Sequence, residues 1–129
     1  MESGKDYRQD LGRRGEDIAC EFLIGKGHTL LARNYRCGHL EIDIITFDGE
    51  GIHFVEVKTR RKSIQAPPQE NVGSLKQNRI VRAAKCFLNS REGLPYGNHE
   101  CMFVVVAITF DGGSAKLEWF PQAYIPIYT

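Results

Sequence analysis

The sequence predicts a single α/β domain with the element order α-β-β-β-α-β-β. Two segments place apolar residues at helical spacing, and five others are rich in β-branched and aromatic residues between turn signals. The chain has 129 residues, of which 42% are hydrophobic and 26% charged, as in ordinary soluble globular domains. This composition excludes a fibrous repeat, a disordered chain and a disulfide-dense small scaffold. We expect one domain over residues 1–129, with residues 1–8 and 126–129 as loose termini.

The first predicted element is a helix over residues 11–26. Asp10 is a good N-cap, because its carboxylate can accept hydrogen bonds from the free N–H groups of the first turn. Gly27 suits the end of this helix. The apolar residues that share one helical face, and that we expect to pack on the sheet, are Leu11, Ile18, Ala19, Phe22 and Leu23.

Three strands are predicted next, over residues 28–36, 39–47 and 52–58. Cys37-Gly38 forms the first turn, and the DGEG sequence of residues 48–51 is a strong hairpin signal. A loop of two or four residues there pairs positions whose numbers sum to 99. A loop with an odd number of residues would instead turn the polar positions of the two strands to opposite faces.

The second half of the chain supplies a loop, a helix and two strands. We expect residues 59–72 to form a long, mobile loop that becomes ordered when substrate binds. Ser74 is a plausible N-cap for a helix over 74–89. A fully apolar run at 102–110 predicts a central strand covered on both faces, followed by a strand at 115–120. The apolar face of the second helix comprises Ile80, Ala84, Phe87 and Leu88.

The four cysteines and four histidines show none of the close spacings typical of zinc sites, so no zinc site is expected. No apolar run is long enough to span a membrane, and the N-terminus carries no export signal. We therefore expect a cytoplasmic protein with no membrane partner. Because such a compartment is reducing, Cys20 and Cys86 are interpreted as small core residues rather than disulfide partners.

Charge is divided unevenly along the chain. Residues 58–91 hold nine Lys and Arg against one acidic residue, a net charge of +8, and the remainder holds eight against fifteen, a net charge of −7. A basic segment beside an acidic remainder fits a phosphate-binding face. The alternative interpretation is a solvated basic helix and loop.

The hairpin places candidate metal ligands together. The register predicted above sets Asp43 opposite Glu56 and Glu41 opposite Lys58. Opposed carboxylates repel unless a cation lies between them, and Mg²⁺ prefers oxygen ligands such as these and the Val57 carbonyl. Lys58 would then orient a water molecule or neutralise developing phosphate charge. The alternative is a solvated polar face with a surface ion pair worth less than about 1 kcal/mol.

Several blocks of the sequence resemble the YraN-like family of uncharacterised bacterial proteins. They are Gly15-Glu16 with Ala19, residues 32–36 (ARNYR), residues 41–45 (EIDII) and residues 54–60 (FVEVKTR), with the second helix fitting the same pattern. The resemblance implies a restriction-endonuclease-like core with a mixed central sheet flanked by helices, similar to Holliday-junction resolvases and other PD-(D/E)xK nucleases. It assigns catalytic roles to Asp43, Glu56 and Lys58, and the role of a helix-borne acid to Glu16.

The sequence therefore predicts a nuclease-like protein that uses Mg²⁺ or Mn²⁺ on nucleic-acid phosphodiesters, DNA rather than RNA, with branched or damaged DNA as candidate substrates. Asp43, Glu56 and Val57 are the expected metal ligands, with Glu41 beside them. A homodimer is consistent with the resolvase resemblance. The alternatives are a non-catalytic nucleic-acid-binding module of the same fold and a protein-binding domain. The expected contacts to the nucleic-acid backbone are Arg60, Arg61, Lys62, Lys76, Arg79 and Arg82.

Overall fold

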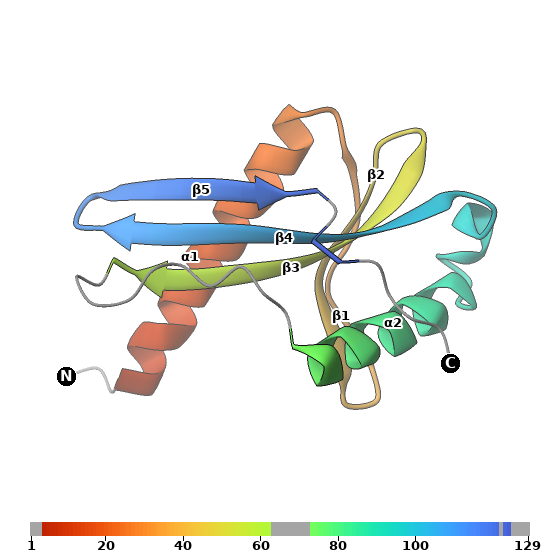
Figure 1. Cartoon of the computed structure of the whole chain (residues 1–129), viewed down its shortest axis with the longest axis horizontal. Helices are drawn as coiled ribbons and strands as arrows, with labels where there is room; N and C mark the ends of the chain where they lie inside the picture. Colours follow the sequence, from red (N-terminus) through yellow and green to blue (C-terminus); the bar gives the residue numbers. More distant parts are fainter. Residues whose placement is uncertain (1–3, 63–72, 122, 125–129) are drawn as a thin grey trace.

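The computed structural model describes residues 4–62, 73–121 and 123–124, which form a five-stranded sheet with one long helix on each face (Figure 1). The expected α-β-β-β-α-β-β order is confirmed, with a short 3-10 helix added before the fourth strand. The elements are α1 (Gly4–Gly25), β1 (Thr29–Cys37), β2 (Leu40–Phe47), β3 (Gly51–Arg61), α2 (Ser74–Leu88), η1 (Leu94–Tyr96), β4 (Glu100–Asp111) and β5 (Ser114–Phe120).

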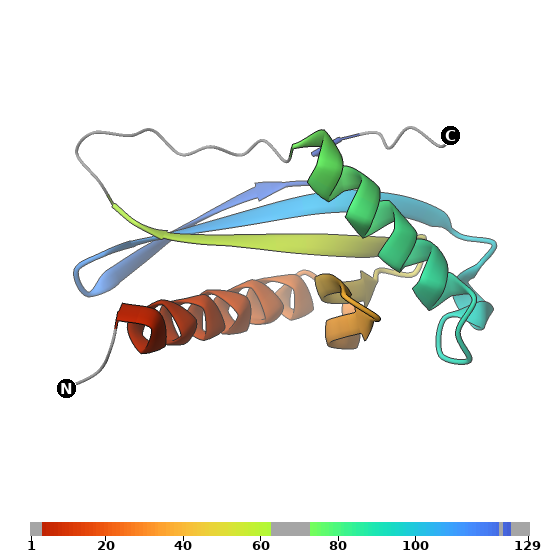
Figure 2. The same cartoon turned by 90° about the horizontal axis from the view of Figure 1, so that it is seen from below.

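The strands follow one another across the sheet in the order β1-β2-β3-β4-β5. Among the strand pairs of the described residues, only β3–β4 is parallel, and α2 lies in the crossover between these two strands. Figure 2 shows α1 and α2 on opposite faces, so the domain has three layers. No helix of the described residues has the length and apolar character needed to span a membrane.

Alternation along the central strands divides the core between the two helices. In β4, Phe103 and Val105 join the cluster that packs on α2, whereas Val104, Val106 and Ile108 join the cluster that packs on α1. These residues are almost fully buried, which confirms the expectation of a strand covered on both faces. The predicted inner faces of both helices are also confirmed, since their apolar residues belong to these two clusters.

Some element boundaries differ from the predicted ones. The helix α1 begins at Gly4, so Asp10 lies inside it and is not the N-cap, and residues 4–8 are helical rather than loose. Its first turns carry few apolar residues, so periodicity could not reveal them. The N-cap of α2 is Gly73, not Ser74, and β3 runs to Arg61, which moves residues 59–61 from the predicted loop into the sheet. Most of that loop, residues 63–72, lies outside the described residues.

A close contact between Gly15 and Thr59 sets the position of α1 on the sheet. A Cβ atom at Gly15 would lie 2.2 Å from Thr59 Oγ1 and 3.2 Å from Thr59 Cβ, so only glycine allows this approach. At Gly12, one turn earlier, a Cβ atom would meet nothing within 4 Å. Of these two glycines, Gly15 alone makes a close approach to the sheet, and this holds the adjacent Glu16 beside β3.

We expect opposite effects from alanine at these two helical glycines. Gly12→Ala should raise the free energy of unfolding by about 0.5–1 kcal/mol, because alanine is the better helix former. Gly15→Ala should lower it by about 1–3 kcal/mol, because the clash with Thr59 exceeds that gain. Urea unfolding of both variants measures the difference. If Gly15→Ala is as stable as Gly12→Ala, or if Thr59→Ala fails to rescue it, the contact does not constrain the helix.

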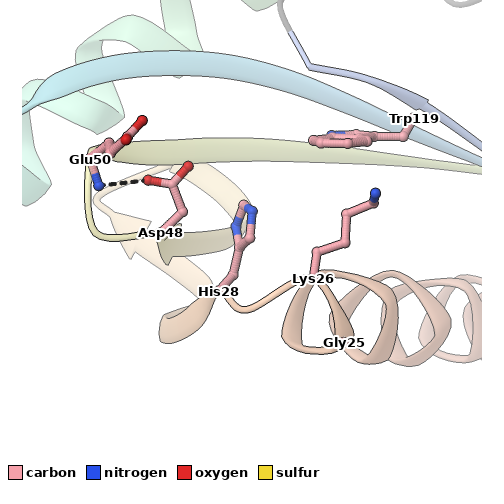
Figure 3. Close-up of a pocket in the computed structure, with 6 residues that line it drawn as sticks. All are labelled: Gly25, Lys26, His28, Asp48, Glu50 and Trp119. Atoms are coloured by element: carbon pink, nitrogen blue, oxygen red, sulfur yellow. Dashed lines mark hydrogen bonds between the residues drawn. The ribbon is translucent and has the colours of Figure 1, made fainter.

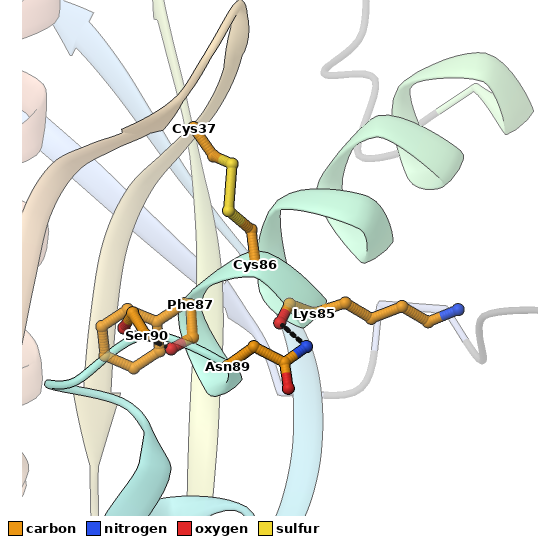
Figure 4. Close-up of a disulfide and its surroundings, with 6 residues drawn as sticks. All are labelled: Cys37, Lys85, Cys86, Phe87, Asn89 and Ser90. Atoms are coloured by element: carbon orange, nitrogen blue, oxygen red, sulfur yellow. Dashed lines mark hydrogen bonds between the residues drawn. A yellow bond between two sulfur atoms is a disulfide. The ribbon is translucent and has the colours of Figure 1, made fainter.

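One disulfide, between Cys37 and Cys86, joins the β1–β2 turn to α2 (Figure 4). The interpretation of Cys86 as an unpaired core residue is therefore wrong, while Cys20 is buried and free as expected. The reason is geometric, because β1 and α2 bring the two Cα atoms to 6.6 Å across a sequence separation of 49. Spacing along the chain does not reveal such a pair.

Candidate active site

The candidate site lies where β2 separates from β3. Their ladder pairs Phe47 with Ile52 through Ile44 with Val55, so the predicted register, in which numbers sum to 99, is confirmed. The ladder stops at Ile44, the residue that follows Asp43 in the chain, and from Glu56 onward β3 continues without β2 beside it. The freed backbone N–H of Val57 donates instead to Asp43 Oδ2 at 2.8 Å. Where the two strands separate, the Asp43 carboxylate therefore accepts the backbone hydrogen bond that a β2 carbonyl would otherwise accept from β3.

Asp43 and Glu56 are in direct contact. Burial and then the negative charge of Glu56 raise the pKa of Asp43 to about 7, against the lowering effect of the Val57 N–H. A hydrogen bond between the two carboxyl groups raises the pKa of Asp43 further. In the absence of a cation, Asp43 is therefore partly protonated near neutral pH. A divalent ion would replace that proton.

A lysine from α2 completes the environment of Glu56. Lys76 Nζ forms an ion pair with Glu56 Oε1, and the Glu56 side chain is only 10% exposed. Near the end of the described chain, Ala123 N donates to Phe103 O at 3.0 Å, and the Tyr124 ring lies 5.3 Å from that of Phe103. Burial and then the charge of Glu56 raise the pKa of Tyr124. A cation and a phenol thus flank the Glu56 carboxylate.

The predicted helix-borne acid reaches the site from the other face of the sheet. The charge of Glu16 on α1 contributes to the raised pKa of Asp43, which places the two acids near one another. Glu16 also pairs with Arg33 Nη2 of β1 at 3.7 Å, and Arg33 Nη1 holds Asp17 at 3.0 Å. Arg33 therefore fixes Glu16 and offsets part of the negative charge.

Lys58 and Val57 lie directly after Glu56 on β3. Lys58 is half-buried and two residues from Glu56, so both side chains stand on the same face of β3. The N–H of Val57 is directed toward β2, and the carbonyl of a strand residue points to the same side as its N–H. The Val57 carbonyl therefore faces the Asp43 side of the strand, as a metal ligand there would.

Glu41 is not brought to Lys58 by the ladder. Beyond Ile44, β2 pairs with β1 alone, where Glu41 lies opposite Arg36 and is exposed. The predicted pairing of Glu41 with Lys58 assumed that the two strands stay together to the end of the hairpin. Their separation removes it and leaves Glu41 outside the carboxylate pair.

The six basic residues expected to contact nucleic acid divide into two groups. Arg60, Arg61 and Lys62 lie at the end of β3, where Lys62 Nζ is 3.4 Å from Asp111 Oδ2. Arg61 is five residues beyond Glu56, or about 17 Å along an extended strand. The second group lies on α2 and consists of Lys76, Arg79 and Arg82, of which Arg79 and Arg82 are exposed.

Two residues near the site, Arg33 and Tyr124, and the contact of Lys76 with Glu56 were not predicted from the sequence. They come from β1, from the segment after β5 and from α2, which meet only after folding. Lys76 was expected on a nucleic-acid face, and the one available signal was its place near the apolar edge of α2. Nothing in the C-terminal sequence marks Tyr124.

Together, the mixed sheet between two helices and the carboxylate pair at a strand separation define an α/β domain with the restriction-endonuclease-like arrangement. Residues 15–108 match the model of the Uncharacterised protein family UPF0102. The chain belongs to this family, which confirms the YraN-like resemblance.

Relatives in the same family align over most of their length. A UPF0102 protein of Anaeromyxobacter dehalogenans is 41% identical over 119 residues, covering 92% of this chain and 87% of the relative. A UPF0102 protein of Chlorobium phaeobacteroides is 46% identical over 122 residues, covering 90% and 94%. One of Pseudomonas syringae is 37% identical over 121 residues, covering 93% and 97%.

Proposed function

We propose that this protein is a Mg²⁺-dependent nuclease that hydrolyses phosphodiester bonds of nucleic acid, with DNA as the favoured substrate. The observation that carries the proposal is the contact between Asp43 and Glu56 at the strand separation, with Lys58 on the same face as Glu56. Two carboxylates in direct contact form a ready site for a hard divalent cation. Mn²⁺ can take the same oxygen ligands.

Each residue has a distinct role in this proposal. Asp43, Glu56 and the Val57 carbonyl hold the ion, which would supply an activated water and neutralise phosphate charge. Lys58 orients the attacking water, and Glu16 holds a second water beside the carboxylate pair. Arg79 and Arg82 contact backbone phosphates next to the site, which gives affinity without sequence information.

A non-catalytic nucleic-acid-binding module is the second candidate, and the ion pair of Lys76 with Glu56 favours it. The Lys76 ammonium neutralises Glu56 without a metal ion, as expected of an idle site. In this case the basic face of α2 would bind phosphates, and the carboxylate pair would serve only the fold. Binding would fall steeply with salt concentration, and the addition of Mg²⁺ would not lead to cleavage.

The test is a cleavage assay on linear duplex, single-stranded and four-way-junction DNA and on matched RNA, with Mg²⁺, Mn²⁺ or chelator. We expect cleavage by the wild type in metal and a loss of about 100-fold or more in Asp43→Asn and Glu56→Gln, because each removes a ligand charge. Glu41→Gln, an exposed acid on the same strand as Asp43, is the matched control and should keep full activity.

Salt-dependent binding separates the two candidates. For both candidate functions, Arg79→Gln and Arg82→Gln should each weaken binding to all sequences. Each should also reduce the slope of log K against log salt concentration by about 1. Wild-type protein that binds DNA in this way but cleaves none of the substrates would establish the binding module. Cleavage that persists equally in Asp43→Asn, Glu56→Gln and the wild type would identify a contaminating enzyme and refute the assigned site.

A further inference from the structure

A second polar cluster lies at the other end of the β2–β3 hairpin. His28 follows α1, Asp48 lies in the hairpin turn and His53 is in β3, and one ligand atom of each lies within 4.8 Å of the others. Both histidines are buried, and their ring centroids are 4.5 Å apart. Residues separated by up to 25 positions in sequence thus present two imidazoles and one carboxylate to a common point.

Neighbouring groups hold all three side chains in place. His28 Nδ1 lies 2.7 Å from the buried Thr46 Oγ1, and Thr46 pairs with His53 across the β2–β3 ladder. Asp48 Oδ1 accepts the backbone N–H groups of Glu50 and Gly51, at 2.9 and 2.8 Å. Asp48 Oδ2 lies 2.9 Å from His53 Nε2. The contacts of Thr46 with His28 and of the two turn N–H groups with Asp48 come from outside the cluster and orient these side chains as outer partners orient metal ligands. The contact between Asp48 Oδ2 and His53 Nε2 joins two candidate ligand atoms, so a bound ion would replace it.

The cluster offers two imidazoles and one carboxylate as donors. Both rings are buried, and His28 Nδ1 is engaged by Thr46 Oγ1, which leaves Nε2 as the ligand atom of His28. Two imidazoles and a carboxylate favour a borderline ion such as Zn²⁺ over Mg²⁺.

We propose that His28, Asp48 and His53 form a binding site for a divalent transition-metal ion of the Zn²⁺ class. In a tetrahedral site with bonds of about 2.0–2.1 Å, neighbouring ligand atoms lie about 3.3 Å apart. The widest separation in the cluster would have to shorten by at most about 1.5 Å to reach that value. Ligation of His53 Nε2 places the ring proton on Nδ1, which is buried without a hydrogen-bond partner in the described part of the chain, and this lowers the affinity.

His28 and Asp48 line an open hollow of about 620 Å³ together with Lys26 and Trp119. Figure 3 shows His28 between Asp48 and Lys26. Lys26 Nζ lies 4.6 Å from the Trp119 ring centroid and 5.2 Å from that of Phe22, so both rings stabilise its ammonium group. Because the hollow is open, water can reach an ion on His28 and Asp48 and complete its coordination.

This site is separate from the carboxylate pair. His53 and Glu56 are three positions apart on β3 and stand on opposite faces of the sheet, with Phe54 on the α2 side and Val55 on the α1 side. The donor atoms also differ, because His28, Asp48 and His53 offer two nitrogens and one oxygen, whereas the carboxylate pair offers oxygens alone. Binding at one site can therefore be tested without reference to the other.

The experiment is titration of the intact, oxidised protein with Zn²⁺ followed by calorimetry, in excess Mg²⁺ to occupy the oxygen ligands of the carboxylate pair, together with the absorption spectrum of the Co²⁺ form under the same conditions. We expect one ion per chain and a cobalt spectrum of nitrogen and oxygen ligands without a thiolate charge-transfer band. His28→Gln and Asp48→Asn should each weaken Zn²⁺ binding by about tenfold or more. His39→Gln removes an exposed histidine and should bind as the wild type does.

In Asp48→Asn, the side chain still has an oxygen that can accept the N–H groups of the turn. This variant should therefore fold even if His28→Gln, which alters a buried residue, does not. The thermal melt of each variant verifies folding before titration. Wild-type protein that binds less than one ion per chain, or variants that bind as tightly as His39→Gln, would overturn the proposal. A thiolate band in the cobalt spectrum would also overturn it, by placing the ion on a cysteine.

Discussion

Asp43→Asn is expected to stabilise the metal-free protein at pH 8 while it abolishes divalent-ion binding at the candidate active site. The pKa of Asp43 is raised to about 7 by burial and by Glu56, whereas an unfolded aspartate titrates near 3.9. The folded state therefore binds the proton more tightly, and the free energy of unfolding falls as pH rises from about 4 to about 7. The full shift corresponds to about 4 kcal/mol.

Asparagine removes the charge and still offers an oxygen to the Val57 N–H. We therefore expect Asp43→Asn to exceed the wild type by about 2 kcal/mol in free energy of unfolding at pH 8 in chelator, and to approach it at pH 5. Urea unfolding at several pH values measures both. Glu41→Gln, which lies outside the carboxylate pair, should show no such crossover. A destabilised Asp43→Asn at pH 8 would mean that the ionised pair is satisfied by the protein alone.

Much of this architecture follows from local pattern. The DGEG turn predicts the β2–β3 register, and this register brings Asp43 toward Glu56. The uninterrupted apolar run from Phe103 to Ile108 predicts a strand buried on both faces, because both sides are apolar there. Where turn chemistry and hydrophobic period agree, the sequence determines the face of each side chain.

The remaining features depend on how elements pass one another in space. The predicted β2–β3 register is correct, but the ladder does not extend to residues N-terminal to Ile44. The expected Glu41–Lys58 pair is therefore not formed. The ion pair of Lys76 with Glu56 required the position of α2 above the sheet. In the same way, His28 and His53 carry no close spacing and meet only because the end of α1 lies beside the hairpin. Long-range pairs of this kind leave no periodic signal.

Loss of the Cys37–Cys86 disulfide is expected to destabilise this chain strongly. The disulfide closes a loop with a sequence separation of 49, for which the chain-entropy model gives about 4 kcal/mol. It also joins the turn end of the β1–β2 hairpin to α2. This end of the hairpin is not paired with β3, because the β2–β3 ladder covers only Ile44–Phe47 of β2. Cys86→Ser should therefore lower the free energy of unfolding by about 2–4 kcal/mol.

Urea unfolding with and without reductant measures this effect, since reduction of the wild type should reproduce the Cys86→Ser loss and leave that variant unchanged. Cys101→Ser, which alters a free and half-buried thiol, is the matched control and should respond to reductant as the wild type does. Because α2 carries Lys76, loss of the disulfide should also loosen the contact with Glu56. If reductant left the wild type unchanged while Cys86→Ser was destabilised, packing of the side chain rather than the covalent link would hold the hairpin to α2.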